Sequence, residues 1–239
     1  MKTVRINGVL LGRSVPFGPA GEPSAIAKKA STKPVKVTET GIVGDEHGDN
    51  LHHGGREKAL HHYALDHYEK WNSEFDPVPT VLNTPGAFGE NLSTLGLTEI
   101  EICVGDIVSA GTTILQVSQP RQPCWKLDIH FAKAGMARRV QESMRTGWYY
   151  RVLQSGWISK GDQLEILNRP HPEWTLTRIL RTVYQLPSDP ETLAGMVELE
   201  LLTPSWRELA ARRLRTGEIE SWSRRLGEYP GNPAPSSHA

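Results

Sequence analysis

Cys124 stands in the stretch QPRQPCWKL (119–127), directly after a strand-like run. The flanking prolines fix part of the backbone and leave no room for a regular element. Arg121 lies three residues before the cysteine and Lys126 two after it, and a nearby cation favours the thiolate. A thiolate is the form that acts as a nucleophile or as a ligand for soft metals. The stretch therefore predicts a chemically active cysteine, although a buried, inert cysteine near a turn fits the residues equally well.

A second candidate is the histidine-rich and glycine-rich stretch at residues 41–63. It holds five of the nine histidines and three acidic residues: His47, His52, His53, His61, His62, Asp45, Glu46 and Asp49. Gly54 and Gly55 then precede an expected helix with Arg56 and Lys58 in its first turn. Backbone amides at such a helix start suit phosphate, and basic residues there oppose the helix dipole unless an anion is bound. A plain turn with solvated charges is the alternative.

The histidines could also belong to a zinc site or serve as the base of a thiol enzyme. The stretch lacks the HExxH pattern, and Asp66 stands where a second histidine would follow His62 at the i+4 position. A thiol enzyme would need a histidine base, for which His53 and His130 are candidates, but no thiol-hydrolase signature is present. Both chemistries are therefore disfavoured.

A third candidate is the loop FGENL, which presents Glu90 and Asn91 after a glycine. A tight loop with a carboxylate and an amide fits a binding site. A surface turn explains the same residues.

The whole chain sets limits on its partners. It has 239 residues, with 27 basic and 27 acidic side chains, so no net charge attracts nucleic acid. Two cysteines fit a reducing compartment rather than a disulfide scaffold. No apolar run approaches the ~18 residues that a membrane helix needs. We expect a cytoplasmic protein with no membrane or nucleic-acid partner, and an oligomer is left open.

Short strands with glycine turns dominate up to about residue 169, which favours a barrel or sandwich. Asn7-Gly8 predicts a hairpin, residues 98–104 read as a strand that turns at Gly105-Asp106, and Gly161-Asp162 predicts another hairpin. Apolar spacing predicts helices within 56–75 and 134–147. Three more are expected after Thr175, at 175–186, 189–202 and 203–226, followed by a disordered end.

In their order along the chain, these stretches resemble the MOSC domain family, whose β-barrel modules are related to the C-terminal part of molybdenum cofactor sulfurases. The likeness is greatest to its YiiM branch and spans roughly residues 20–227. The segments that carry it are GEPSAIAK (21–28), GIVGDEH (41–47), HHGGREKALHHY (52–63), FGENLSTLGLTE (88–99), VGDI (104–107), QVSQPRQPCWKL (116–127), WYYRVLQSGWI (148–158) and SWSRRL (221–226).

The resemblance implies a mainly β fold with α elements. We expect a MOSC-type β-barrel with flanking helices at 1–169, a three-helix domain at 170–227 and a disordered tail at 228–239. It implies that Cys124 binds the molybdenum of a molybdenum–molybdopterin cofactor and that Arg121 receives the pterin phosphate. The other cofactor-binding candidates are His53, Gly54, Gly55, Lys58, Glu90 and Asn91.

The resemblance also implies a reductase of N-hydroxylated compounds, for example in the detoxification of N-hydroxylated bases. Besides Cys124, the catalytic candidates are His53 and Asp45, as proton relays. No flavin, haem or iron–sulfur motif is found in the sequence, so a separate flavoprotein is the expected electron donor, and no pyridoxal phosphate is expected. The alternative is a protein that carries the cofactor without turnover.

Overall fold

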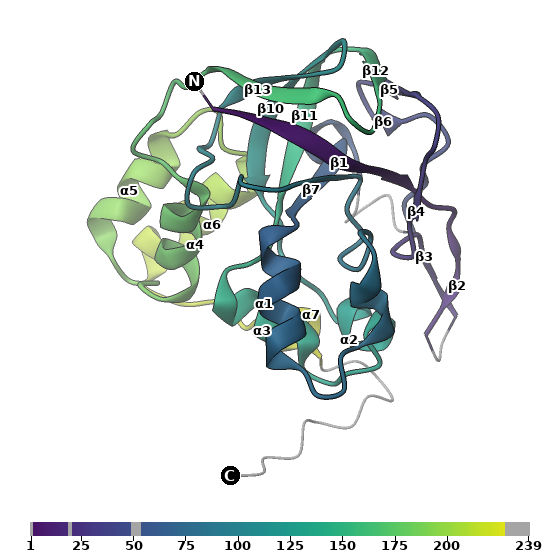
Figure 1. Ribbon diagram of the computed structural model, residues 1–239. Helices are drawn as coiled ribbons and strands as arrows, with labels where there is room; N and C mark the ends of the chain where they lie inside the picture. The colour runs from purple at the N-terminus through teal and green to yellow at the C-terminus, as the bar shows by residue number, and fades with distance from the viewer. Residues whose placement is uncertain (1, 19–20, 49–53, 228–239) are drawn as a thin grey trace.

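The computed structural model describes residues 2–18, 21–48 and 54–227. Its centre is a barrel of strands in the order β13-β9-β10-β11-β7-β8-β1, closed by pairing of β1 with β13 (Figure 1). The pairing of β7 with β8 is parallel and the other barrel pairings are antiparallel. The strands are β1 (Thr3–Leu11), β7 (Leu60–Ala64), β8 (Leu92–Thr94), β9 (Ile107–Ala110), β10 (Thr113–Pro120), β11 (Trp148–Gln154) and β13 (Gln163–Asn168).

Smaller strands extend this barrel. A short strand, β4 (Lys29–Ala30), pairs with the end of β1. A separate sheet has the order β12-β5-β6 and a hairpin pairs β2 with β3. These strands are β12 (Gly156–Ile158), β5 (Val35–Thr38), β6 (Gly41–Ile42), β2 (Val15–Phe17) and β3 (Glu22–Ser24).

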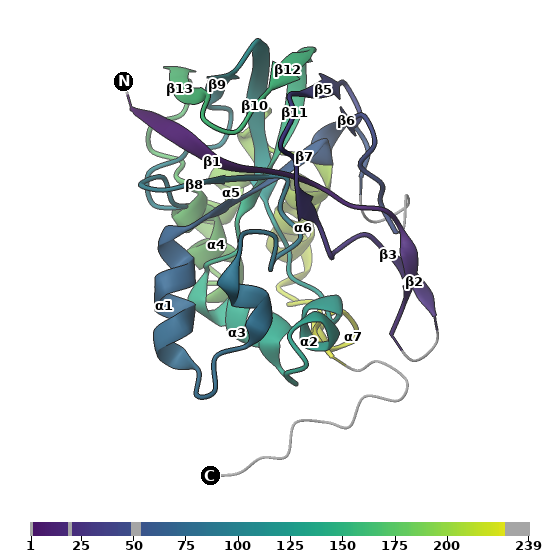
Figure 2. The same cartoon turned by 45° about the vertical axis from the view of Figure 1, so that its right-hand side comes forward.

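Helices cover one end of the barrel. They are α1 (Asp66–Glu74), α2 (Lys126–His130), α3 (Met136–Ser143) and α7 (Ser223–Leu226), which gather at the same end in both views (Figures 1 and 2). Their apolar side chains form a core of their own that includes Trp71, Leu127, Val140 and Leu226. Two short 3-10 helices, η1 (Arg56–Lys58) and η2 (Thr80–Asn83), lie in the connections. No helix of the described residues is long and apolar enough to cross a membrane.

The C-terminal helices α4 (Leu176–Tyr184), α5 (Pro190–Glu198) and α6 (Pro204–Thr216) pack beside the barrel. Their buried residues belong to the same hydrophobic core as the barrel interior. Backbone bonds join the two: the Val104 N–H donates to the Trp174 carbonyl at 2.9 Å, and the Thr203 N–H to the Ser118 carbonyl at 3.3 Å. The predicted barrel with flanking helices and three C-terminal helices is confirmed. The single helix predicted at 203–226 is wrong in its second half, because α6 ends at Thr216 and α7 begins only at Ser223.

The helix predicted within 56–75 is wrong in its first half. After η1 the chain forms strand β7, and α1 begins only at Asp66. All five residues of β7 are buried, between β11 on one side and β8 on the other. A strand buried on both faces has no polar–apolar alternation, so Leu60 and Tyr63 imitate a helical stripe.

Two predicted hairpins and one predicted strand are also wrong. Asn7-Gly8 makes no hairpin, because β1 runs through it with a register shift against β8. Residues 98–104 form turns and one isolated bridge, from Cys103 to Thr175, rather than a strand, and the predicted turn follows at Gly105. Gly161-Asp162 joins β12 to β13, but these strands pair with β5 and with β1 and β9 instead of with each other. At both predicted hairpins, strand partners distant in sequence decide the pairing.

Candidate functional site

A pocket lies where β10 ends and the Cys124 loop begins. It encloses about 590 Å³ of empty space, counting the part open to solvent. Of the predicted site residues, the described lining includes Gly54, Lys58, Asn91, Arg121 and Cys124. The pocket therefore brings together candidates from three separate stretches of the sequence.

Cys124 is half-buried in this pocket, between β10 and the short helix α2. Its carbonyl accepts a hydrogen bond from the Leu127 N–H at 3.0 Å, which starts the first turn of α2. The other cysteine, Cys103, is fully buried elsewhere, and burial raises the pKa of its thiol to about 11. The two cysteines thus divide into an accessible pocket thiol and an inert core thiol.

The pocket lining is predominantly basic. Its described cations are Lys28, Lys58, Arg121 and Lys126, against the single carboxylate of Glu46. Glu46 is already bound by Arg13 at 2.5 Å and by the Ser14 N–H at 2.8 Å. Lys28 is paired with Asp45 behind the lining, and the remaining excess of positive charge favours an anionic ligand.

Two lining side chains hold buried nitrogens without a hydrogen-bond partner among the described residues. They are Nη1 of Arg121 and Nε2 of His61. Arg121 is only 6% exposed, and a buried guanidinium nitrogen without an acceptor is costly. Burial, with the charge of Arg121 adding to it, lowers the pKa of His61 well below its usual value, so this ring is neutral. The pocket wall therefore fits an anionic group that accepts hydrogen bonds.

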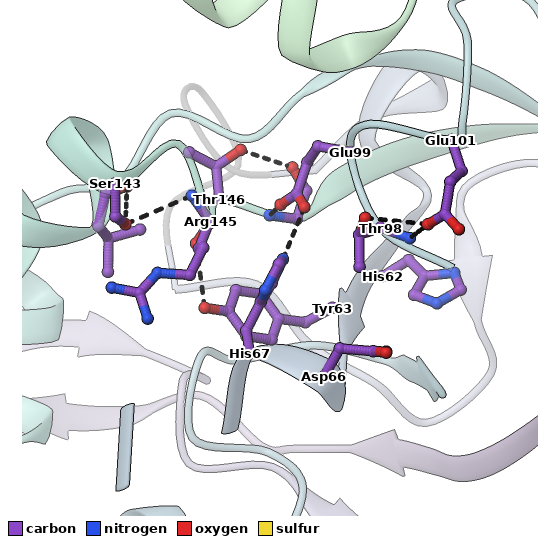
Figure 3. A network of polar contacts seen from close by, with 12 residues as sticks. His62, Tyr63, Asp66, His67, Thr98, Glu99, Glu101, Ser143, Arg145 and Thr146 are labelled. Carbon is purple, nitrogen blue, oxygen red and sulfur yellow. Dashed lines mark hydrogen bonds and ion pairs between the residues drawn. The ribbon is translucent and has the colours of Figure 1, made fainter. Parts of the chain in front are cut away.

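Gly147 fixes the backbone of Arg121. The Arg121 N–H donates to the Gly147 carbonyl at 2.9 Å, and the Gly147 N–H donates to Oε1 of Glu99 at 2.7 Å. Oε2 of Glu99 lies 2.6 Å from Nε2 of His67, and Figure 3 shows these two side chains pointing toward each other. The sequence reasoning missed Glu99 and His67, since no local pattern marks them. In the sequence, Gly147 marks only the end of the helix expected within 134–147.

Asp45, predicted as a proton relay, is a buried acceptor of several hydrogen bonds. Its carboxylate accepts from Nζ of Lys28 at 2.5 Å, from the Gly12 N–H at 2.7 Å and from Nδ2 of Asn91 at 2.8 Å. The Asp45 and Lys28 side chains are 1% and 6% exposed. Burial lowers the pKa of Lys28, and Asp45 partly offsets this. The contacts suit a residue that holds Lys28 and Asn91 at the pocket wall, and the relay role stays a prediction.

The residues of the GENL loop differ in their placement. Asn91 lines the pocket, accepts from the His61 N–H at 3.0 Å and donates to the Leu10 carbonyl at 3.1 Å. Glu90 does not belong to the described lining. It is fully buried and accepts from Tyr68, Gly86 and Phe88 at 2.5, 2.7 and 3.0 Å. Burial raises the pKa of Glu90. Its hydrogen bonds from Gly86 and Phe88 show that the carboxyl shapes its own loop, and its cofactor contact stays a prediction.

The glycine pair does not precede an α-helix, so the predicted helix-dipole anion site is wrong. Gly54 and Gly55 have φ values of +114° and +83°, and only the three-residue η1 follows. A Cβ on Gly54 would lie 3.1 Å from the His47 ring, so glycine lets the two surfaces of the pocket approach. Lys58 reaches the lining from η1. His53 lies outside the described residues.

Within the described residues, no group of three histidine, cysteine or acidic side chains could hold a metal ion. His62, one of the zinc candidates, lies in the barrel interior, where its ring nitrogens contact Tyr150 at 3.0 Å and Thr94 at 2.9 Å. A metal at Cys124 would take further ligands from a cofactor. The accessible thiol, the basic lining and the unpartnered guanidinium nitrogen fit a cofactor with both a metal and a phosphate.

Comparisons with known proteins identify the family of this chain. A MOSC domain model matches residues 49–165, and a YiiM-like 3-alpha helix domain model matches residues 174–217. Protein YiiM of Escherichia coli (strain K12) is 39% identical over 208 residues, which cover 87% of this chain and 92% of that protein. A protein named Reductase from Gibberella moniliformis is 38% identical over 194 residues, covering 81% of this chain and 34% of that longer protein. The crystal structure of YiiM from Escherichia coli has a TM-score of 0.78 at 30% identity, covering 95% of this chain and 99% of the other. This chain belongs to the MOSC domain family, in its YiiM branch with a C-terminal three-helix domain.

Proposed function

We propose that this protein is a molybdenum-cofactor-dependent oxidoreductase that reduces N-hydroxylated compounds such as N-hydroxylated purine bases. The observation that carries the proposal is the half-buried thiol of Cys124 in a basic pocket beside the unpartnered Nη1 of Arg121. Membership of the MOSC family supports the cofactor, and the relative named Reductase supports the reaction class.

Different residues of the pocket would bind different parts of the cofactor. Cys124 would bind the molybdenum through its thiolate, the soft donor of the pocket. Arg121 and Lys58 would bind the phosphate, and Asn91 with Gly54 would form the wall against which the pterin lies. When bound, the cofactor supplies the two-electron chemistry that breaks the N–O bond of the substrate.

The reaction converts an N–OH group, two electrons and two protons into N–H and water. The electrons come from a separate flavoprotein, because no flavin, haem or iron–sulfur motif is found in the sequence. The protons pass through His53 or Asp45, and the water that forms leaves through the open side of the pocket. We place the protein in the cytoplasm, with a small molecule as its substrate.

Replacing Cys124 by alanine tests the proposal. Cys124→Ala should retain the fold, lose molybdenum and lose reduction of N-hydroxylated substrates, because the soft ligand is gone. Cys103→Ala is the matched control, since Cys103 is buried away from the pocket. The measurements are metal content, oxidised-pterin fluorescence and turnover with an artificial donor, after expression in a molybdenum-replete host.

Full turnover by Cys124→Ala would contradict the mechanism. Stoichiometric molybdenum without turnover on any N-hydroxylated substrate would contradict the reductase and favour a cofactor carrier.

A further inference from the structure

The last described helix, α7, lies beside the loop that carries Cys124. Figure 2 shows α7 next to α2, which begins two residues after the cysteine. Nearly a hundred residues separate α7 from this loop in sequence, and the C-terminal helices α4, α5 and α6 lie between them in chain order. Their adjacency is therefore a product of the whole fold.

Arg225 of α7 contacts the residues on both sides of Cys124. Its carbonyl accepts a hydrogen bond from the Trp125 N–H at 2.8 Å. Its guanidinium donates through Nη1 to the Pro123 carbonyl and through Nη2 to Oε1 of Gln141 on α3, the latter at 2.6 Å. One residue thus ties the chain before the cysteine, the chain after it and a neighbouring helix.

The loop needs such an external anchor. Pro120 and Pro123 carry no N–H, so the segment between β10 and α2 has few donors of its own. The Arg121 N–H is bound by Gly147 and the Trp125 N–H by Arg225. Between these two bonds, the Arg225 side chain also holds the Pro123 carbonyl, which adjoins Cys124.

The anchor itself is firmly seated. The Arg225 guanidinium lies over the Trp222 ring at 4.8 Å. Trp222 makes an edge contact with Tyr184 of α4, with ring centroids 5.6 Å apart. Leu226 is 3% exposed and packs in the same core as Leu127 of α2. Arg225 is therefore held from the helical side as well as from the loop side.

We propose that Arg225 is a positioning residue that holds the Cys124 thiol in the direction needed to bind the cofactor metal. The proposal rests on the proposed function for what Cys124 binds, while the anchoring of the loop is a property of the protein alone. It follows that the three-helix region and α7 contribute to the site without lining it.

Three substitutions at Arg225 separate anchoring from packing. Arg225→Met keeps the apolar contact with Trp222 but removes the donors. Arg225→Lys restores one charged donor, and Arg225→Ala removes side-chain donors and packing together. Arg224→Ala is the matched control, because Arg224 is the exposed neighbour on the same helix. Circular dichroism and thermal unfolding of each full-length variant establish that it is folded.

The first measurement is hydrogen exchange of the Trp125 N–H, followed by NMR in the purified full chain. The Trp125 N–H donates to the backbone carbonyl of Arg225, which every substitution keeps, so its exchange reports opening of the loop. In Arg225→Met and Arg225→Ala we expect this opening, and with it the exchange, to be about tenfold faster, because the charge-assisted bond to the Pro123 carbonyl is lost. Arg225→Lys should recover part of the protection, and Arg224→Ala should match the wild type.

The second measurement is the rate at which molybdenum is lost during dialysis of the loaded protein. Second-sphere changes around a metal ligand weaken binding by about tenfold or more, so Arg225→Met should lose molybdenum faster than Arg225→Lys. Wild-type exchange at Trp125 and wild-type molybdenum retention in a folded Arg225→Met would overturn the proposal while leaving the proposed function intact. Faster exchange at Trp125 in a protein that never holds molybdenum would support the anchoring and refute the cofactor.

Discussion

His62 is a buried histidine whose environment keeps it neutral. It stacks on Trp148 with ring centroids 4.2 Å apart, and its nitrogens contact Tyr150 and Thr94. Burial lowers the pKa of His62 from 6.5 to about 3. Burial also lowers the pKa of its neighbour His61 well below its usual value. These two rings cannot take up protons without disturbing the barrel.

The stability of the protein should therefore fall in mild acid. Between pH 6.5 and 3 the unfolded chain binds a proton at His62 that the folded state does not, so the free energy of unfolding decreases as the pH falls. At pH 5 this histidine alone accounts for about 2 kcal/mol. Urea unfolding between pH 7 and 5 measures the effect.

His62→Gln should lower the free energy of unfolding at pH 7. It should also reduce the slope of this free energy against pH, by an amount that corresponds to the uptake of up to one proton on unfolding. His171→Gln is the control, because His171 is half-buried before α4, away from the barrel interior. An unchanged slope in His62→Gln would show that His62 titrates alike in the folded and unfolded states.

At the scale of elements, the turn between α3 and β11 sets the position of Arg121. Gly147 has a φ of +70°, and a Cβ there would lie 2.3 Å from the His62 carbonyl oxygen. Its N–H and carbonyl bind Glu99 and Arg121. A side chain at this position must therefore shift either β7 or the start of the Cys124 loop.

Gly147→Ala should cost about 2 to 5 kcal/mol, the sum of left-handed strain and overpacking. Gly217→Ala is the control, because Gly217 has a similar φ of +67° but nothing within 4 Å of the added Cβ. It should cost only about 1–2 kcal/mol. Chemical denaturation gives both values, and equal losses would contradict the steric argument. The molybdenum content of the folded fraction of Gly147→Ala would show whether a displaced Arg121 still supports cofactor binding.

Elements with one polar face were predictable from sequence and elements buried on both sides were not. Apolar spacing located α3 and the C-terminal helices because each exposes one face to water. Strand β7 has no exposed face, and its partners β11 and β8 lie far along the chain, so the pattern could not identify it.

In the candidate site, residues marked by a local sequence pattern were predictable, and residues that act through long-range contacts were not. Cys124, Arg121 and Lys58 were found because local charge and proline spacing mark them, and they meet in one pocket. Glu99 and Arg225 act on that pocket through backbone groups of residues far from them in sequence. Hydrogen bonds of this kind leave no local pattern, so only the fold reveals them.

At the scale of the whole molecule, the barrel and the three helices share one hydrophobic core. That core includes Leu115 and Val108 of the barrel together with Ile179, Met196 and Trp206 of the helices. The predicted domain boundary at residues 169–170 therefore crosses a continuous apolar interior. The division of the chain into two domains at this boundary stays a prediction. Since α7 follows the helices and holds the Cys124 loop, their stability bears directly on the site.

Trp206→Ala tests this coupling. Trp206 is 2% exposed in the shared core, so its truncation should cost about 3 to 5 kcal/mol. If the molecule unfolds as one unit, amide exchange in β10 of the barrel accelerates by the same free energy as exchange in α6. Leu214→Ala on the same helix is the control, because Leu214 is 40% exposed and should change stability by no more than about 0.5 kcal/mol. Barrel amides that keep their protection while the helical amides lose theirs would show two independent units. The helices could then unfold while the barrel stays folded, and the loss of the Arg225 contacts would be the route by which this unfolding affected the Cys124 loop.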